Sequence, residues 1–334
     1  MKKIFILFVI LFVISGCNKS DDKKILINFK NKILESKSYK LNGVMEIVSN
    51  EEKYTYNIMV SYKKDDYYNV TLKNQISGHE QVLLKNKDGV YVITPELNKS
   101  FKFQSEWPNN SSQAYLLKSI VNDINNDVSS KVENNNDNII ITSKVNYPNN
   151  GNLLYQKTTI NKKGKLLNNI IYDKENKEVI KVKFDDIDYN VTYNDDYFNL
   201  SSVIDEDCCD TDSSTNVTID NIIYPLYIPS NTYLNSKDVL NDDNNSRVIL
   251  TFSGSKPFML VEEPVKITSK TNITPIYGEP ILSKDGFVAL TDNSLTWISN
   301  NIEYYLTGES LTNEELLNIA DSLNYEITST MNEK

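Results

Sequence analysis

The fold is decided by residues 25–62, which read ILINFKNKILESKSYKLNGVMEIVSNEEKYTYNIMVSY. Over residues 25–36 the apolar side chains recur every three or four positions, which is the spacing of one face of a helix. From residue 39 the period changes to two, because apolar and polar residues alternate over 39–47 and again over 54–62. The stretch therefore predicts an amphipathic helix followed by two half-buried strands.

The alternation continues toward residue 200, with turn sequences such as KKDD at 63–66 between the apolar runs. A second helix is predicted from residue 114 to 128, behind polar residues at 110–113 that are suited to capping it. Further strands are predicted at 67–72, 80–84, 90–94, 100–104, 139–145, 155–160, 166–172 and 179–184. A sheet of about ten strands tends to curl, and helices cover its apolar face. We therefore predict an α+β protein built on a large curved antiparallel sheet, a half-barrel.

Residues 201–216 are acidic and rich in Ser and Thr, so they are predicted to be a linker after a half-barrel domain at 25–200. A smaller α+β domain is predicted at 217–334. Its helix follows Thr312 and Glu315, whose spacing matches a capping box. Its apolar runs lie at 222–228, 248–252, 258–262, 287–291 and 296–298.

The first seventeen residues have the pattern of a bacterial lipoprotein signal. Two lysines precede an apolar run at 4–14, which is too short to cross a membrane, and Ser15-Gly16-Cys17 follow it. This ending resembles the lipobox, in which the chain is cut before the cysteine and the thiol is acylated. We predict a signal peptide at 1–16, lipid on Cys17, a tether at 17–24 and anchoring to the outer face of the cell membrane. The alternative is an ordinary secretion signal in which Cys17 has no role.

The composition argues against several classes of function. The chain of 334 residues has 45 acidic and 35 basic side chains and a net charge of −10, which disfavours nucleic acid as a partner. It has one His and 10 Gly, so triads, His-ligated metals and glycine-rich phosphate loops are disfavoured too. We predict no catalytic residue, no metal site and no cofactor.

The few groups that carry reactive chemistry have simpler interpretations. His79 is predicted to lie in a solvated turn or at a strand edge, and Cys208 and Cys209 to have no fixed role, with a vicinal disulfide or pairing between chains as the alternatives. The acidic run at 205–212 lacks the glycine and terminal glutamate of an EF-hand loop. The carboxylate pairs 185–186 and 262–263 are neighbours on strands, so the two members of each pair face opposite ways.

The aromatic residues offer the main candidates for binding. They fall on three stretches of the predicted sheet: Tyr54, Tyr56 and Tyr62; Phe101 and Phe103; and Trp107. The ordinary interpretation is that they fill the core. Because a curved sheet under few helices often keeps an unfilled concave face, the alternative is that they bind an acyl chain or an apolar partner segment.

Residues 89–117 read GVYVITPELNKSFKFQSEWPNNSSQAYLL. This stretch resembles a tract of the YdcC-type sporulation lipoproteins, a spore-former branch of the LolA/RseB-like lipoproteins that is related to the germination lipoprotein GerS. The resemblance covers residues 23–200, and residues 305–323 are similar to the C-terminal module of the same family. It implies a non-enzymatic, extracytoplasmic binding protein of sporulation or germination, with a cell-wall amidase as a partner. The alternative that it implies is a carrier of lipid, acyl chains or lipoproteins.

Overall fold

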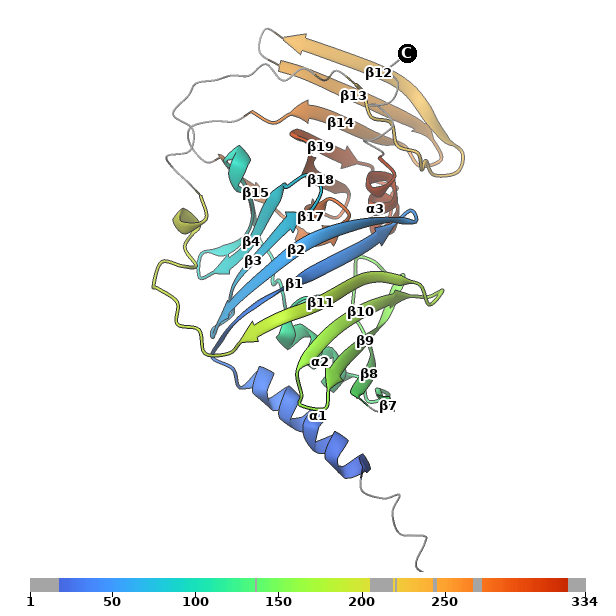
Figure 1. The fold of residues 1–334 in the computed structure, drawn as a ribbon. Coiled ribbons are helices and arrows are strands. Elements are labelled where there is room, and N and C mark those ends of the chain that lie inside the picture. Colours follow the sequence, from blue (N-terminus) through green and yellow to red (C-terminus); the bar gives the residue numbers. More distant parts are fainter. Residues whose placement is uncertain are drawn as a thin grey trace, which may run out of the picture.

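The structure, a computed structural model, describes residues 18–135, 137–204, 219, 221–242, 245–266 and 272–323. It contains two sheets that lie one above the other, with helices against both (Figure 1). The signal peptide, Cys17 and most of the predicted linker lie outside the described residues.

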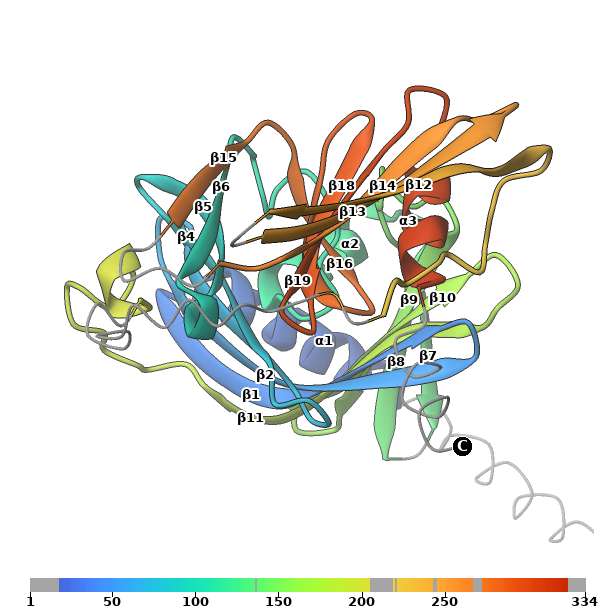
Figure 2. The same cartoon turned by 90° about the horizontal axis from the view of Figure 1, so that it is seen from above.

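The first sheet has twelve strands in the order β15-β6-β5-β4-β3-β2-β1-β11-β10-β9-β8-β7. Neighbours are antiparallel except β15, which runs parallel to β6. The strands are β1 (Ser38–Ser49), β2 (Glu52–Lys63), β3 (Tyr67–Asn74), β4 (Glu80–Asn86), β5 (Gly89–Thr94), β6 (Lys99–Phe103), β7 (Lys131–Asn135), β8 (Asn138–Lys144), β9 (Leu153–Asn161), β10 (Leu166–Asp173), β11 (Glu178–Asp188) and β15 (Asn272–Ile276), with the short helix η1 (Pro95–Leu97) after β5. The sheet curls round the helices without closing into a barrel (Figure 2), which confirms the predicted fold class.

Helix α1 (Asn18–Leu34) begins earlier than the sequence indicated. Residues 18–24, predicted as part of a tether, form its first turns. The Asp22 carboxylate accepts hydrogen bonds from the side chains of Asn134 and of Lys162, the latter at 2.6 Å. The acidic first turn also suits the positive end of the helix dipole. The helix is therefore fastened to β7 and to the β9–β10 turn from its second turn onward.

Helix α2 (Leu117–Asn126) lies in the concave side of the sheet and is shorter than predicted. The polar residues before it do not cap it, because the Ser112 hydroxyl bonds instead to the Asp123 carboxylate at 2.9 Å and to the Asn146 amide at 2.7 Å. Val128, predicted to be on the apolar stripe, lies beyond the helix and is exposed. We call residues 105–126 the plug, because they fill the concave side.

The convex side of the sheet is covered by residues 193–204, which include the short helix η2 (Leu200–Ser202). Phe198 and Ile204 pack on Val82 and Leu84, and the Tyr193 hydroxyl donates to the Tyr39 carbonyl at 2.7 Å. Both faces of this part of the sheet are therefore buried by the chain itself.

The second sheet has seven strands in the order β12-β13-β14-β19-β18-β17-β16. Its strands are β12 (Thr232–Asp242), β13 (Asn245–Gly254), β14 (Phe258–Pro264), β16 (Glu279–Ser283), β17 (Gly286–Leu290), β18 (Ser294–Ser299) and β19 (Ile302–Thr307). Helix α3 (Asn313–Asp321) packs on the sheet, and its capping box between Thr312 and Glu315 is confirmed. The apolar run at 222–228 lies outside the strands of this sheet and forms an isolated bridge between Pro225 and Leu323.

The second sheet and α3 enclose a hydrophobic core of their own, and part of this sheet also joins the main core of the first sheet. Phe287, Ala289 and Ile298 of the second sheet belong to the same buried cluster as the concave face of the first. Strand β15, which follows the predicted linker in sequence, extends the first sheet. The division of the chain at 201–216 remains a prediction, but both the first sheet and the main core include residues from each side of it.

Candidate functional site

The six aromatic residues predicted to bind a ligand all belong to the main core or touch it. Tyr56, Tyr62, Phe101, Phe103 and Trp107 are buried, with Tyr56 4% and Trp107 1% exposed. Tyr54 is partly buried at the edge of the same cluster, and its hydroxyl donates to Glu52 at 2.7 Å.

Two of the predicted aromatics are joined by tyrosines that the sequence did not single out. Tyr62 stacks on Tyr39 with ring centroids 4.9 Å apart, and it contacts Tyr68 at 5.0 Å. Tyr68 meets Trp107 edge-on at 5.6 Å, so the row of rings runs from β1 to the plug. Burial raises the pKa of Tyr39 and Tyr68 well above its ordinary value. The rings form a packed, uncharged layer.

Polar side chains hold the other half of the plug in place. Asn169 on β10 donates to the Ala114 carbonyl at 3.2 Å, and Gln156 on β9 donates to the Ile120 carbonyl at 3.2 Å. Asn169 also donates to Gln156 at 3.0 Å and accepts from Thr158 at 2.8 Å. Since buried amides need such partners, this network fixes the plug's backbone against the sheet.

The concave face is therefore occupied by the protein's own residues. The Lys118 ammonium donates to the Tyr62 hydroxyl, and the Lys85 ammonium donates to the Trp107 carbonyl at 2.6 Å. An acyl chain would have to displace the plug, which includes Trp107, to reach Tyr62.

The groups with reactive chemistry lie apart from one another. His79 precedes β4, and its Nδ1 pairs with the carboxylate of Glu96. Glu262 is buried and accepts the Ile223 amide at 3.1 Å, whereas its neighbour Glu263 pairs with Arg247 at 2.6 Å, which confirms that the two face opposite ways. Burial raises the pKa of Glu262 to about 7.

Within the described ranges, no three His, Cys, Asp or Glu side chains are grouped so as to hold a metal ion. Cys17, Cys208, Cys209 and the acidic residues at 205–212 lie outside those ranges. No helix among the described residues is both long and apolar enough to span a bilayer.

Polar contacts also cross the seam between the two sheets. The Gln81 side chain of β4 both accepts from the Phe287 amide at 2.7 Å and donates to the Phe287 carbonyl at 3.3 Å. The Tyr56 hydroxyl donates to the Lys284 carbonyl. These contacts fix the β16–β17 turn against β2 and β4.

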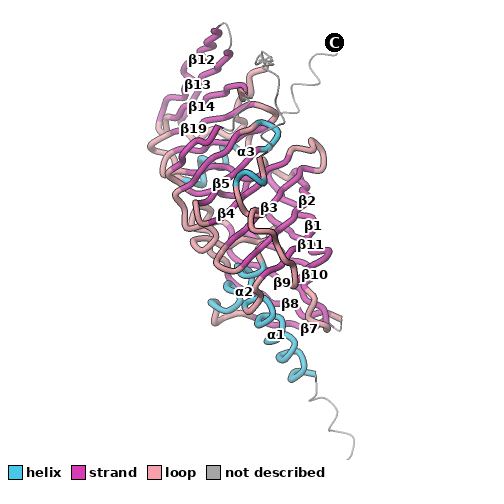
Figure 3. Tube along the Cα trace, turned by 90° about the vertical axis from the view of Figure 1, so that its left-hand side faces the viewer, coloured by secondary structure: helices cyan, strands magenta, loops and turns pink. Residues whose placement is uncertain are grey.

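The largest concentration of exposed apolar side chains lies on and before β12. Of 17 large hydrophobic residues exposed in the described ranges, eight fall between positions 224 and 240. Four of them, Tyr233, Leu234, Val239 and Leu240, lie on β12 itself, and we call these four residues the β12 strip. Strand β12 is an edge strand that pairs only with β13 among the described residues. The strip lies at the opposite end of the molecule from α1 (Figure 3).

Comparison with known proteins gives the family. The family described as "Sporulation protein YdcC-like" matches residues 1–198. The chain is 31% identical over 332 residues to "Sporulation protein YdcC" of Bacillus subtilis strain 168, covering 97% of this chain and 98% of that protein. The chain belongs to the YdcC-like sporulation protein family. The resemblance indicated by residues 89–117 is confirmed.

Solved structures with a similar chain path are more distant from this YdcC-like protein. A crystal structure of MucB is 11% identical and covers 90% of this chain and 97% of its own, with a TM-score of 0.35. The structure of the CwlD amidase from Clostridioides difficile in complex with the GerS lipoprotein contains a chain that is 16% identical. That match covers 50% of this chain and 95% of the other, with a TM-score of 0.23.

Proposed function

We propose that this YdcC-like protein is a lipid-anchored, non-enzymatic binding protein of the envelope of sporulating or germinating cells, and that it engages a protein partner through the β12 strip. The exposure of β12 supports this proposal. An edge strand presents unpaired backbone groups, and proteins normally protect such edges with charges, bulges or covering segments. A partner strand could add to β12 by backbone hydrogen bonds, while its side chains contact the strip.

The described sheets end in four edge strands, β15, β7, β12 and β16, and β7 differs from β12. Strand β7 ends the first sheet and is exposed along its whole length, but its only large apolar residue, Val132, stands between Lys131 and Glu133. Charges of this kind discourage pairing with another strand. Strand β12 also carries charges, at Lys237 and Asp238, and has a register shift between Leu234 and Ser236. Its four exposed large apolar residues, against one on β7, nevertheless favour β12 over β7 as the edge that accepts a partner.

The partner class to test first is a cell-wall amidase, since the resemblance to germination lipoproteins implies one. Mature protein carrying Val239→Glu would be compared with the wild type in co-purification from envelope extracts of sporulating cells. Val132→Glu is the matched control, because Val132 is 49% and Val239 45% exposed and each lies on an edge strand. We expect wild type and Val132→Glu to recover the amidase, and Val239→Glu to lose it at least tenfold.

Equal recovery of the amidase by Val239→Glu would show that β12 is not the contact. Recovery of no wall enzyme by any form would exclude an amidase as the partner.

The carrier alternative requires the plug to leave the concave face. Native mass spectrometry of protein purified without detergent would show a bound acyl chain if that alternative holds.

Anchoring through Cys17 is part of the proposal and has its own test. Because Asn18 already belongs to α1, a lipid on Cys17 would join the membrane to a helix that is fastened to the sheet. The Cys17→Ala variant should be released from the membrane fraction, since two or more acyl chains are needed for stable anchoring. Retention of that variant in washed membranes would refute the lipid anchor.

A further inference from the structure

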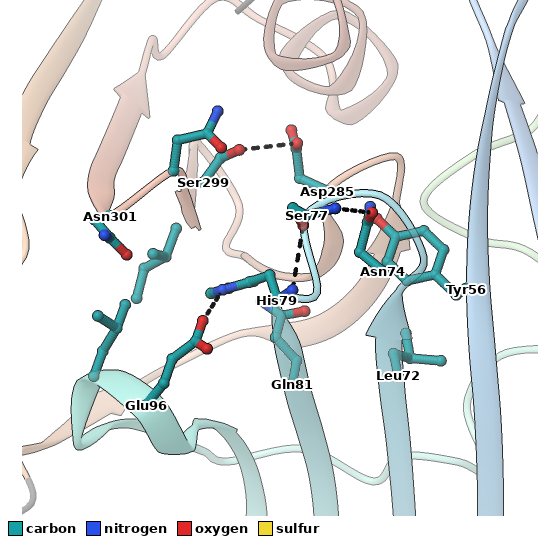
Figure 4. A pocket seen from close by; sticks show the side chains of 13 residues that line it. Tyr56, Leu72, Asn74, Ser77, His79, Gln81, Glu96, Asp285, Ser299 and Asn301 are labelled. Atoms are coloured by element: carbon teal, nitrogen blue, oxygen red, sulfur yellow. Dashed lines mark hydrogen bonds and ion pairs between the residues drawn. The ribbon is translucent and has the colours of Figure 1, made fainter.

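A cavity of about 430 Å³ lies at the seam between the two sheets, and we call it the seam pocket. Its lower wall is formed by β2, β3, β4 and η1, and its upper wall by the β16–β17 turn and by β18 with the turn that follows (Figure 4). The volume is within the range of small-molecule binding sites. It borders the main core at Tyr56 and Leu72, so one of the six predicted aromatic residues lines it, and it includes no residue of the β12 strip.

His79, the single imidazole of the chain, lines this pocket. Its Nδ1 is engaged by the Glu96 carboxylate, and its backbone amide donates to the Ser77 hydroxyl at 3.3 Å (Figure 4). Its Nε2 is buried and has no hydrogen-bond partner among the described residues. A buried polar atom without a partner is costly, so it points to a group that the described residues do not supply.

The walls of the pocket are fixed before any ligand arrives. The Asn74 carboxamide oxygen accepts the backbone amides of Ile76 and Ser77 at 2.9 and 3.0 Å, which holds the turn that carries His79. Across the pocket, the Ser299 hydroxyl donates to the Asp285 carboxylate at 3.2 Å. A preformed site loses less entropy when it binds a ligand.

The lining selects a chemical class. Two carboxylates, of Glu96 and Asp285, border the pocket together with Asn, Gln and Ser side chains, and none of the thirteen lining residues is Lys or Arg. An anion would find no cationic partner there. A hydroxyl group both donates and accepts, so it can satisfy Nε2 of His79 whichever protonation state the imidazole has. The buried aliphatic side chains of Leu72, Leu97 and Ile298 supply apolar surface for the carbon face of such a molecule.

We propose that the seam pocket binds a neutral polyhydroxylated ligand, a sugar unit of one or two rings, with Nε2 of His79 and the Glu96 carboxylate contacting its hydroxyl groups. The site is independent of the β12 strip. Because its two walls belong to different sheets, an occupied pocket also strengthens the seam.

The single imidazole gives a direct test. The His79 ring resonances of histidine-labelled protein would be followed by NMR at fixed pH during titration with glucose, N-acetylglucosamine, cellobiose and N,N′-diacetylchitobiose. Inorganic phosphate and putrescine would serve as the anionic and cationic probes. We expect a saturable shift with at least one sugar at millimolar concentration and none with phosphate. Saturable shifts with phosphate or putrescine and with none of the sugars would overturn the proposal. The absence of a saturable shift with every probe would overturn it as well.

Variants locate the binding. Ser77→Trp should fill the pocket mouth and abolish the sugar-induced shift, whereas Ser310→Trp, at another exposed serine, should leave it unchanged. Glu96→Gln keeps the shape and removes the charge, so calorimetry should show affinity reduced about tenfold, as for the loss of one charge-assisted hydrogen bond. Unchanged affinity in both Ser77→Trp and Glu96→Gln, with normal thermal unfolding, would place the sugar elsewhere.

Discussion

Asp123 on α2 is a carboxylate whose charge is disfavoured by its position. Desolvation raises its pKa from 3.8 to about 7, although the hydrogen bond from Ser112 acts in the opposite direction. Between about pH 4 and pH 7, Asp123 therefore carries a proton in the folded protein and has lost it in the unfolded chain. The stability that comes from this proton is present below pH 4 and is lost as the pH rises through 7.

Replacing Asp123 by Asn should remove this pH dependence. The variant keeps an oxygen for the Ser112 hydroxyl and has no charge to bury, so it should be more stable than the wild type above pH 7. We expect its Tm at pH 8.5 to be higher by about 2–4 °C, with the difference shrinking toward pH 4. Thermal unfolding followed by circular dichroism at both pH values would measure it.

Asp127, four residues further along, provides the opposite case. Hydrogen bonds from the Ser129 hydroxyl and the Lys144 amide lower its pKa, so it stabilises the fold above its unfolded pKa and loses that effect in acid. Asp127→Asn should therefore be less stable than the wild type at neutral pH and converge with it in acid. The same direction of change in both variants would contradict the burial of Asp123.

At the scale of single elements, β4 and β17 meet through one amide. Gln81 is buried, and its side chain satisfies both the N–H and the C=O of Phe287. A Cβ added to Gly286, which has φ +93°, would lie 2.2 Å from the Gln81 side-chain oxygen. Only glycine gives this turn both the backbone conformation and the close approach that the amide contact needs.

Gln81→Leu should destabilise the protein by about 1–3 kcal/mol, because it removes both partners of the Phe287 backbone inside the seam. Chemical denaturation would measure the change. Gln75→Leu is the control, since the Gln75 side chain is exposed and, among the described residues, bonds only to the exposed side chain of Asn57. It should change stability by less than about 0.5 kcal/mol. Equal effects of the two substitutions would show that the amide contact does not hold the seam.

The strands that the sequence predicted have at least one buried face, and some, such as β4 and β17, are buried on both. Strand β1 has a burial pattern that alternates from Tyr39 to Ile47, and the printed sequence shows the same alternation. Strands β12 and β15 were missed, because their side chains are mostly exposed and leave no apolar period. Their place is set by hydrogen bonds to β13 and β6, which are contacts between distant parts of the chain.

At the scale of the whole molecule, the half-barrel depends on the second sheet. Phe287 packs edge-on against Tyr115 of the plug, with ring centroids 6.1 Å apart. The Tyr56 hydroxyl donates a hydrogen bond to the Lys284 backbone carbonyl. A fragment ending at residue 204 would expose this part of the core. Loss of one buried Phe side chain alone costs about 3–5 kcal/mol.

We therefore expect residues 18–204 to bind a hydrophobic dye such as ANS and to unfold without a sharp transition. The control is the full chain with a protease site placed within 210–214 and then cut, which should unfold like the intact protein because both parts remain together. Cooperative unfolding of the isolated fragment at the wild-type Tm would contradict the shared core.

The sequence by itself determined the family, the curved antiparallel sheet and the capping box of α3, and it left the aromatic residues open between core filling and ligand binding. These features depend on local period, on spacing and on motifs that neighbouring residues carry. Only the tertiary structure decided that the plug fills the concave face, that β15 extends the first sheet, and that His79, Glu96 and Asp285 border one pocket. Those arrangements depend on contacts between residues far apart in the chain, whose free energy is gained only when both sides meet, so no local pattern predicts them.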